Sequence, residues 1–174
     1  AAAYAAAFTV LATALRRRYQ LAGRLFQLLA VAMTPLASYG LERAAGVWPA
    51  PLTLSQRFLR VPAPTYGHWA ILCAATLIVG LLALRLWLSP LLLAAVAPAF
   101  AGLCSSLGAW RFGWRLERDA WVGVSCGLVL LLAAWLVDRR TREDFGFWLY
   151  LFGVMAFWSG LAALPNHGEI GELA

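Results

Sequence analysis

Lysine is absent from this 174-residue sequence, and charged residues of any kind are scarce. All 14 basic residues are arginine, and 13% of the residues are charged, whereas an average soluble domain has about 25%. Hydrophobic residues make up 63% of the chain, and the mean hydropathy is +0.74. A soluble protein of this size has too much surface to hide so much apolar material. The composition therefore predicts a single domain embedded in a membrane.

Acidic residues and histidines are missing from the middle of every long apolar run. Proton-coupled transporters and ion pumps usually need such a group within the membrane, where it is costly enough to be functional by default. The sequence also has no HExxH, GxSxG, Walker or glycine-rich dinucleotide-binding pattern. These absences argue against an enzyme, and we predict no catalytic residues.

Cysteine occurs only three times, at Cys73, Cys104 and Cys126, and never in a CxxC pair. Metal centres and disulfides need thiols at defined spacing. All three cysteines lie inside apolar runs, which is typical of small buried hydrophobic residues. We therefore predict no metal site.

Apolar runs separated by short charged segments predict an all-α, polytopic transmembrane helical bundle. A helix needs about 20 apolar residues to cross a hydrocarbon core of about 30 Å. Pro35 and Pro98 should kink two of the helices, because proline removes a backbone hydrogen bond. We expect AAAYAAAFTV, which lacks an initiating Met and a charged n-region, to be neither a signal peptide nor the true start of the gene product. The predicted spans are 1–15 (incomplete), 25–41, 69–84, 90–110, 120–137 and 145–164, with a proline-rich surface loop at 42–68.

The arginines flank the predicted spans and set a topology. Eight fall on one side of the membrane and six on the other, and the positive-inside rule assigns the richer side to the cytoplasm or its equivalent. We expect five arginines on that side to contact lipid headgroups: Arg16, Arg17, Arg18, Arg139 and Arg140. Nucleic-acid binding would need arginines gathered on a soluble face, so we expect no nucleic-acid partner. The predicted location is a bacterial inner membrane or an organellar, thylakoid-type membrane.

Glycines recur every seven residues in the last apolar run, at Gly146, Gly153 and Gly160. On a helix, such a spacing drifts by only about 20° per step, so these glycines share one face, beside Ala156. A face of small residues lets another helix approach closely, which is how helices in lipid gain packing energy. Two interpretations stay open: packing within the bundle, or docking of another membrane subunit.

Seven aromatic residues surround this glycine face, and they could pack within the bundle or contact flat ligands such as quinones, carotenoids or chlorins. The only histidines, His68 and His167, lie at the ends of spans on the same predicted side. A neutral imidazole can ligate a porphyrin-type metal centre, so both are candidate cofactor-binding residues. The alternative is that they are solvated side chains at the membrane interface.

Three stretches of the chain match a known pattern. They are FGFWLYLFGVMAFWSGL at 145–161, preceded by VDRRTRED; VAMTPLASYGLERAAGVWP at 31–49; and, more loosely, SPLLLAAVAPAF at 89–100. Together they resemble a family of uncharacterised bacterial polytopic membrane proteins, over about half of this chain. Members of that family are longer and carry a Ser-Met-Asp-like element where this chain has LCSSLGAW, so no role of that Asp is carried over. The resemblance implies a fold and leaves the activity open.

The leading hypothesis from the sequence is a non-enzymatic accessory or structural subunit of a larger membrane complex, of a respiratory or photosynthetic kind. Its expected partners are membrane lipids and other integral membrane subunits. No cofactor is required, and bound lipids or pigments are the expected ligands. One alternative is a transporter or lipid-handling protein with a polar cavity lined by Thr34, Ser38, Ser105 and Ser106. The other is a pigment- or haem-binding membrane subunit.

Overall fold

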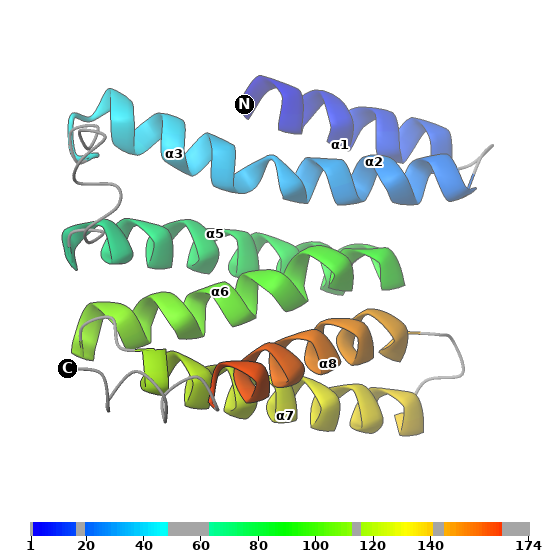
Figure 1. Cartoon of the computed structure of the whole chain (residues 1–174). Coiled ribbons are helices and arrows are strands. Elements are labelled where there is room, and N and C mark those ends of the chain that lie inside the picture. The colour runs from blue at the N-terminus through cyan, green and yellow to red at the C-terminus, as the bar shows by residue number, and fades with distance from the viewer. Residues whose placement is uncertain (1, 17–19, 49–62, 113–115, 141–144, 165–174) are drawn as a thin grey trace, which may run out of the picture.

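The computed structural model describes residues 2–16, 20–48, 63–112, 116–140 and 145–164. These residues are almost all helical and contain no strand, which confirms the predicted all-α bundle. In Figure 1 the helices run side by side with similar axes, from α1 and α2 at one edge to α7 and α8 at the other. The elements are α1 (Ala2–Arg16), α2 (Gln20–Ala32), α3 (Thr34–Ala44), α5 (Ala63–Trp87), a 3-10 turn η1 (Pro90–Leu92), α6 (Leu93–Phe112), α7 (Leu116–Arg140) and α8 (Gly146–Ala163).

Five helical segments are long and apolar enough to cross a membrane. They are Leu21–Ala44, which joins α2 and α3, then Thr65–Trp87, Pro90–Arg111, Asp119–Arg140 and Gly146–Ala163. The apolar helix Ala2–Ala14 is shorter than these five.

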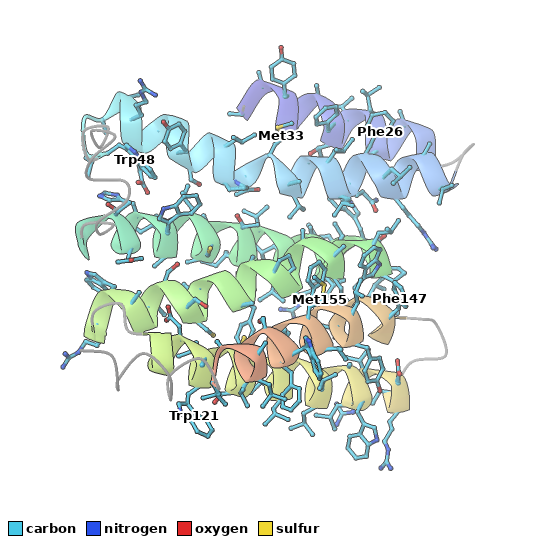
Figure 2. All side chains as sticks on the ribbon, viewed as in Figure 1. Phe26, Met33, Trp48, Trp121, Phe147 and Met155 are labelled. Carbon is cyan, nitrogen blue, oxygen red and sulfur yellow. The ribbon has the colours of Figure 1, made fainter. Side chains whose placement is uncertain are left out.

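The large apolar side chains of these spans face outward more often than inward. Only 22% to 33% of the residues in each span are buried inside the protein. Leu86 and Trp158 are 75% and 70% exposed, and Figure 2 shows Trp121 projecting outward from α7. Apolar surface of this extent would be strongly unfavourable in water, whereas hydrocarbon is a good solvent for it. The chain is therefore a multi-pass integral membrane protein.

The two prolines within the spans act differently. Met33 separates α2 from α3, and Pro35 occupies the first turn of α3. N–H groups in the first turn of a helix have no partner within that helix, so the missing N–H of proline costs little there. The backbone N–H of Met33 donates to the Leu29 carbonyl, and that of Ala37 donates to the Met33 carbonyl, both at 3.0 Å. Backbone hydrogen bonding thus continues across the interruption, and α2 and α3 form one span. Pro98 lies inside α6, which continues through it as one uninterrupted helix. Pro98 thus does not divide the helix, and the predicted kink there stays a prediction.

The predicted surface loop at 42–68 is too long. Helix α3 continues to Ala44, and α5 begins at Ala63, so both ends of the predicted loop are helical. Pro64 stands in the first turn of α5, where proline is favoured and does not mark a loop. The helix that contains the span predicted at 69–84 accordingly extends over Ala63–Trp87. Of the rest of the predicted loop, residues 45–48 are non-helical and residues 49–62 lie outside the described residues.

Arginines that the sequence predicts on the same side of the membrane lie at the same end of the bundle. In Figure 1, α5 and α7 both end at the same side of the bundle, which is where α2 and α8 begin. This end carries the arginines Arg24, Arg85, Arg139 and Arg140, and the opposite end carries Arg43 and Arg111. The cytoplasmic orientation of the first end stays a prediction.

Two clusters of buried apolar residues hold the helices together. One joins α6, α7 and α8 and consists of Leu93, Val96, Ala97, Cys126, Leu130, Ala134 and Leu149. The other joins α2, α5 and η1 through Val31, Ala83 and Leu92. Helices α7 and α8 have the most extensive contact of any pair, and α5 with α6 comes next.

Candidate functional site

The glycine face of α8 is filled from within the chain. Gly146, Gly153 and Gly160 are all buried, and all three face α7. A Cβ atom on Gly160 would lie 2.6 Å from the backbone oxygen of Ala120 and from the backbone nitrogen of Val124. Contact this close is only available to glycine. The small residues on this face therefore serve the α7–α8 pair, and the alternative in which another protein docks on them is wrong.

The partner residues on α7 are also glycines, and they were not among the predicted packing residues. A Cβ on Gly123 would lie 3.2 Å from the Cα of Gly160, and one on Gly127 would lie 2.5 Å from the backbone nitrogen of Phe157. Gly123 and Gly127 form a GxxxG pattern, which is a known signal for close helix packing in membranes. The pattern was visible in the sequence beside the seven-residue glycine spacing of α8. Ala156, the fourth predicted packing residue, is half-buried beside Gly123.

Of the five predicted headgroup arginines, the structure describes the side chains of Arg139 and Arg140. Both are exposed in the last turn of α7. The guanidinium of Arg139 lies 3.8 Å from the centre of the Trp135 ring, within the range of a cation–π interaction. Arg16 ends α1, and Arg17 and Arg18 lie outside the described residues.

Of the two predicted cofactor histidines, the structure describes only His68, which is in the second turn of α5. His167 lies outside the described residues, so their pairing stays a prediction. The Nδ1 atom of His68 lies 2.8 Å from Oε2 of Glu42, near the end of α3. Because a carboxylate accepts hydrogen bonds, Nδ1 carries the proton and donates. With only 15% of its side chain exposed, His68 is not the solvated interfacial residue that the alternative described.

Glu42 was missed because it falls in the stretch that was predicted as loop. It lies in the last turn of α3, where the helix dipole disfavours an acidic side chain. A carboxylate in such a place needs a partner, and this is the signal that could have singled it out. Its side chain is only 14% exposed.

Aromatic rings lie next to His68 of the Glu42–His68 pair. The Trp48 ring lies 4.6 Å from that of Tyr39, edge to face, and 5.4 Å from that of His68. The Tyr39 hydroxyl accepts a hydrogen bond of 3.0 Å from Arg43. Figure 2 shows Trp48 at the end of α3, beside the start of α5. We call these five residues, Tyr39, Glu42, Arg43, Trp48 and His68, the α3–α5 polar cluster.

One oxygen of Glu42 is left unsatisfied. The Oε2 atom is bonded to His68, but Oε1 is buried without a hydrogen-bond partner. A buried, unpaired polar atom costs about 1–3 kcal/mol, and more when it is charged. The α3–α5 polar cluster therefore contains one hydrogen-bond acceptor, Oε1 of Glu42, that no donor satisfies.

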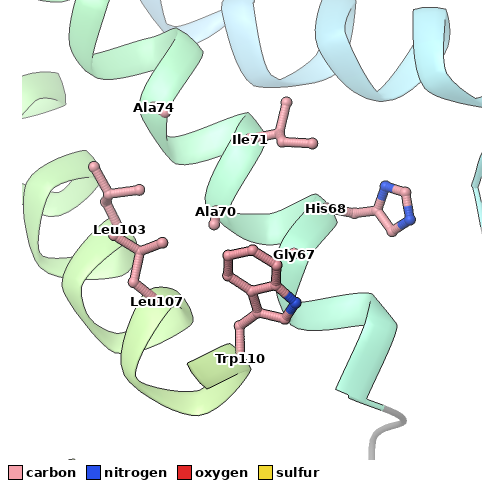
Figure 3. Close-up of a pocket in the computed structure, with 8 residues that line it drawn as sticks. All are labelled: Gly67, His68, Ala70, Ile71, Ala74, Leu103, Leu107 and Trp110. Carbon is pink, nitrogen blue, oxygen red and sulfur yellow. The ribbon is translucent and has the colours of Figure 1, made fainter. Parts of the chain in front are cut away.

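An apolar groove begins at His68 and continues between α5 and α6. It has a volume of about 520 Å³ and is lined by Gly67, His68, Ala70, Ile71, Ala74, Leu103, Leu107 and Trp110. In Figure 3 the Trp110 indole lies against the α5 backbone at Gly67, while the His68 ring points away from Trp110. A Cβ on Gly67 would lie 3.7 Å from the indole nitrogen, which is an ordinary van der Waals contact, so this packing does not require glycine. We call this feature the α5–α6 groove.

The groove and the polar cluster lie at different depths of the span. Glu42 is two residues from the end of its span and His68 three, which places both within about 5 Å of the span ends. Ala74 is nine residues into the same span, at a depth of about 14 Å. The polar cluster thus lies near the ends of its spans, and the groove extends toward their middle.

A second cavity of about 330 Å³ lies between α6, α7 and α8. Ser105 and Ser159 contribute hydroxyl groups to a lining that also includes Pro98, Cys126 and Phe152. Of the polar cavity residues predicted for a transporter, only Ser105 lines either cavity; Thr34, Ser38 and Ser106 line neither. The Ser159 hydroxyl bonds its own helix, at 2.9 Å from the Ala156 carbonyl.

Two of the three cysteines are neighbours in space. Cys104 on α6 lies close to Cys126 on α7, although the two are far apart in the sequence. Cys126 belongs to the buried cluster between these helices, and Cys104 is partly buried and packs against it. Across the residues that the structure describes, there is no group of three or more potential metal ligands.

Comparison with protein-family models, curated proteins and solved structures finds no match to this chain. The class of the protein therefore follows from the fold alone, which is that of a multi-pass helical membrane protein. Membership of the uncharacterised bacterial family stays a prediction.

Proposed function

We propose that this chain is a non-enzymatic lipid-handling membrane protein, which holds one acyl chain of a membrane lipid in the α5–α6 groove. This was an alternative in the sequence analysis, and the groove is the observation that carries it. Its volume of about 520 Å³ falls in the range of about 300–1,000 Å³ that is usual for ligand pockets.

The lining of the groove suits a hydrocarbon chain. Apart from His68 and the indole nitrogen of Trp110, its side chains are aliphatic or absent. Ile71, Leu107 and Trp110 are exposed to the surroundings of the protein, so the groove is accessible from the side, within the membrane. A chain that enters laterally keeps its apolar surroundings and gains close packing against a preformed surface.

The position of the polar cluster supports the same occupant. A lipid places its headgroup at the interface and its chains toward the bilayer centre. The polar residues Glu42 and His68 lie near the span ends, and Ala74 and Leu103 lie deeper on the groove side. The groove and the cluster therefore present apolar and polar surfaces in the order in which a lipid needs them.

Filling the groove tests the proposal. Ala74→Phe would place a ring where the chain should lie, and Ala162→Phe, at an exposed position of α8, is the matched control. The purified protein would be analysed by native mass spectrometry in mild detergent, with retained phospholipid counted per chain. We expect the wild type and Ala162→Phe to retain lipid and Ala74→Phe to lose it. Equal retention in all three would refute the proposal.

The accessory-subunit hypothesis remains a second candidate because of the outer face of α8. Phe147, Val154, Met155 and Trp158 are all more than half exposed on the side away from α7. Aromatic side chains and methionine are enriched at protein interfaces. A photo-crosslinking amino acid at position 158 tests this candidate in the native membrane. A crosslink to one defined protein supports a complex, and crosslinks to lipid alone count against it.

A further inference from the structure

We infer that the second cavity, between α6, α7 and α8, binds a neutral lipid through a free hydroxyl group of that lipid. This site is separate from the α5–α6 groove, so the inference goes beyond the proposed function and does not depend on it. The cavity has a volume of about 330 Å³, within the range of about 300–1,000 Å³ that is usual for ligand pockets. Its depth and its polar lining determine which lipid it takes.

The cavity is open to the lipid that surrounds the protein. Ser105 on α6 and Met155 and Ser159 on α8 all line it, and all three residues are exposed. Gly123 and the buried Cys126 line it on the side of α7. A ligand can therefore enter laterally from the membrane and reach the side chains that line the cavity.

The depth of the cavity argues against a charged headgroup. Ser159 lies four residues from the end of its span at Ala163, and Ser105 lies six residues from the end of its span at Arg111. Both spans end on the same side of the bundle (Figure 1), which gives the two serines depths of about 6 and 9 Å. The residues described as lining the cavity include no charged side chain. Because an unpaired charge is costly within a membrane, the occupant is neutral.

The two serine hydroxyls offer different hydrogen bonds to a ligand. A serine hydroxyl has one O–H donor and two acceptor lone pairs. The Ser159 hydroxyl donates its proton to the Ala156 carbonyl at 2.9 Å, so toward a ligand it can only accept. The Ser105 hydroxyl makes no hydrogen bond to a described residue, so its proton is available to a ligand. A ligand that pairs with both must donate to Ser159 and accept from Ser105.

A neutral lipid with a free hydroxyl group meets both requirements. Its O–H donates, and its own oxygen or a neighbouring ester carbonyl accepts. A ligand with carbonyl groups alone can only accept, which leaves it without a hydrogen bond to Ser159. Phe152 and Met155 add a ring and a thioether to the lining, and both pack well against hydrocarbon. The chemical class of the ligand is therefore a lipid alcohol, such as a diacylglycerol or a sterol.

Methylation of the ligand hydroxyl gives a direct test. Dioleoylglycerol and its methyl ether share their acyl chains and every acceptor, but only dioleoylglycerol can donate. The purified full chain in mild detergent would be offered an equimolar mixture of the two, and native mass spectrometry would count each bound species. We expect dioleoylglycerol to be retained about threefold to tenfold more than the ether. Cholesterol and its methyl ether form a second pair; a preference for the alcohol in either pair supports the inference, and its absence from both overturns it.

Serine variants locate the preference on the protein. Ser159→Ala removes the acceptor, so the preference for the alcohol should fall to near unity. Ser105→Ala removes a donor that both members of a pair use, so it should lower the retention of both and leave their ratio unchanged. Ser106→Ala, at the next residue of α6, is the matched control, because Ser106 lines neither cavity, and it should change neither quantity. If Ser159→Ala keeps the full preference, the inference is overturned.

The Ala74→Phe variant separates this site from the α5–α6 groove. It fills the groove and leaves the second cavity intact, so the preference for the alcohol should persist in it. If Ala74→Phe abolishes the preference, the hydroxyl is recognised in the groove and the inference is wrong. If the wild type retains no phospholipid but still prefers the alcohol, the proposed function fails while this inference holds.

Discussion

Replacing Gly160 with alanine should weaken the α7–α8 pair, and the structure gives the size of the effect. The new Cβ would lie 2.6 Å from Ala120 O and Val124 N, which is 0.8 Å short of the 3.4 Å at which ordinary contact begins. Both atoms belong to the backbone of α7, so no side chain can rotate away. The two helices must separate locally, by most of an ångström.

A separation of this size affects the whole contact. A gap of about 0.5–1 Å forfeits a quarter to a half of the dispersion energy of each atom pair that it opens. Overpacked positions usually lose about 1–3 kcal/mol, while the higher helix propensity of alanine returns up to about 1 kcal/mol. We therefore expect Gly160→Ala to destabilise the protein by about 1–2 kcal/mol.

Gly40 provides the matched control for this substitution. It is helical and exposed in α3, and a Cβ there would have nothing within 4 Å. Gly40→Ala should therefore show only the gain in helix propensity, about 0.5–1 kcal/mol of added stability. The assay is unfolding of the purified protein in mixed micelles with increasing sodium dodecyl sulfate, followed by circular dichroism. If Gly160→Ala is as stable as Gly40→Ala, the close packing described above is wrong.

Three further predictions concern other parts of the fold. Leu92→Ala should destabilise the protein by about 2–5 kcal/mol because Leu92 is fully buried against Val31 and Ala83, whereas Leu86→Ala, at a 75% exposed position, should change the same unfolding free energy by less than about 0.5 kcal/mol. Leu88→Gly should stabilise the protein by about 1 kcal/mol in the same assay, because Leu88 is exposed and has a φ of +46°, which strains any residue with a Cβ. A loss of stability in this variant would contradict the account. A membrane-permeant oxidant such as iodine should join Cys104 to Cys126 in a disulfide. Thiol labelling of the denatured, oxidised protein should then find one free thiol in the wild type, none in Cys73→Ser and two in Cys104→Ser.

The class of the fold could be predicted from the sequence because hydrocarbon imposes a simple requirement on it. A run of about 20 residues without charge is stable in a membrane as a helix, whatever it packs against. The runs at 90–110, 120–137 and 145–164 each correspond to an observed span with slightly different ends. Where the prediction was wrong, at 42–68, polar and proline residues extend a helix beyond its apolar part, and hydropathy does not detect such extensions.

The candidate site could be predicted only in part. The seven-residue spacing of Gly146, Gly153 and Gly160 defines a face of α8, but the same spacing is compatible with a partner inside or outside the chain. His68 was singled out as a rare residue at a span end, yet its partner Glu42 lies 26 residues earlier, on another helix. No local pattern connects two residues that far apart.

The sequence alone determined that this chain is helical, that it lies in a membrane and which residues share a face of each helix, because these properties depend on neighbours one or two turns away. Only the tertiary structure decided that α7 covers the glycines of α8, that Glu42 meets His68 and that a groove remains open between α5 and α6. Those features depend on how the helices pair, and pairing in lipid is determined by the fit of whole surfaces, since hydrophobicity cannot distinguish one apolar helix from another.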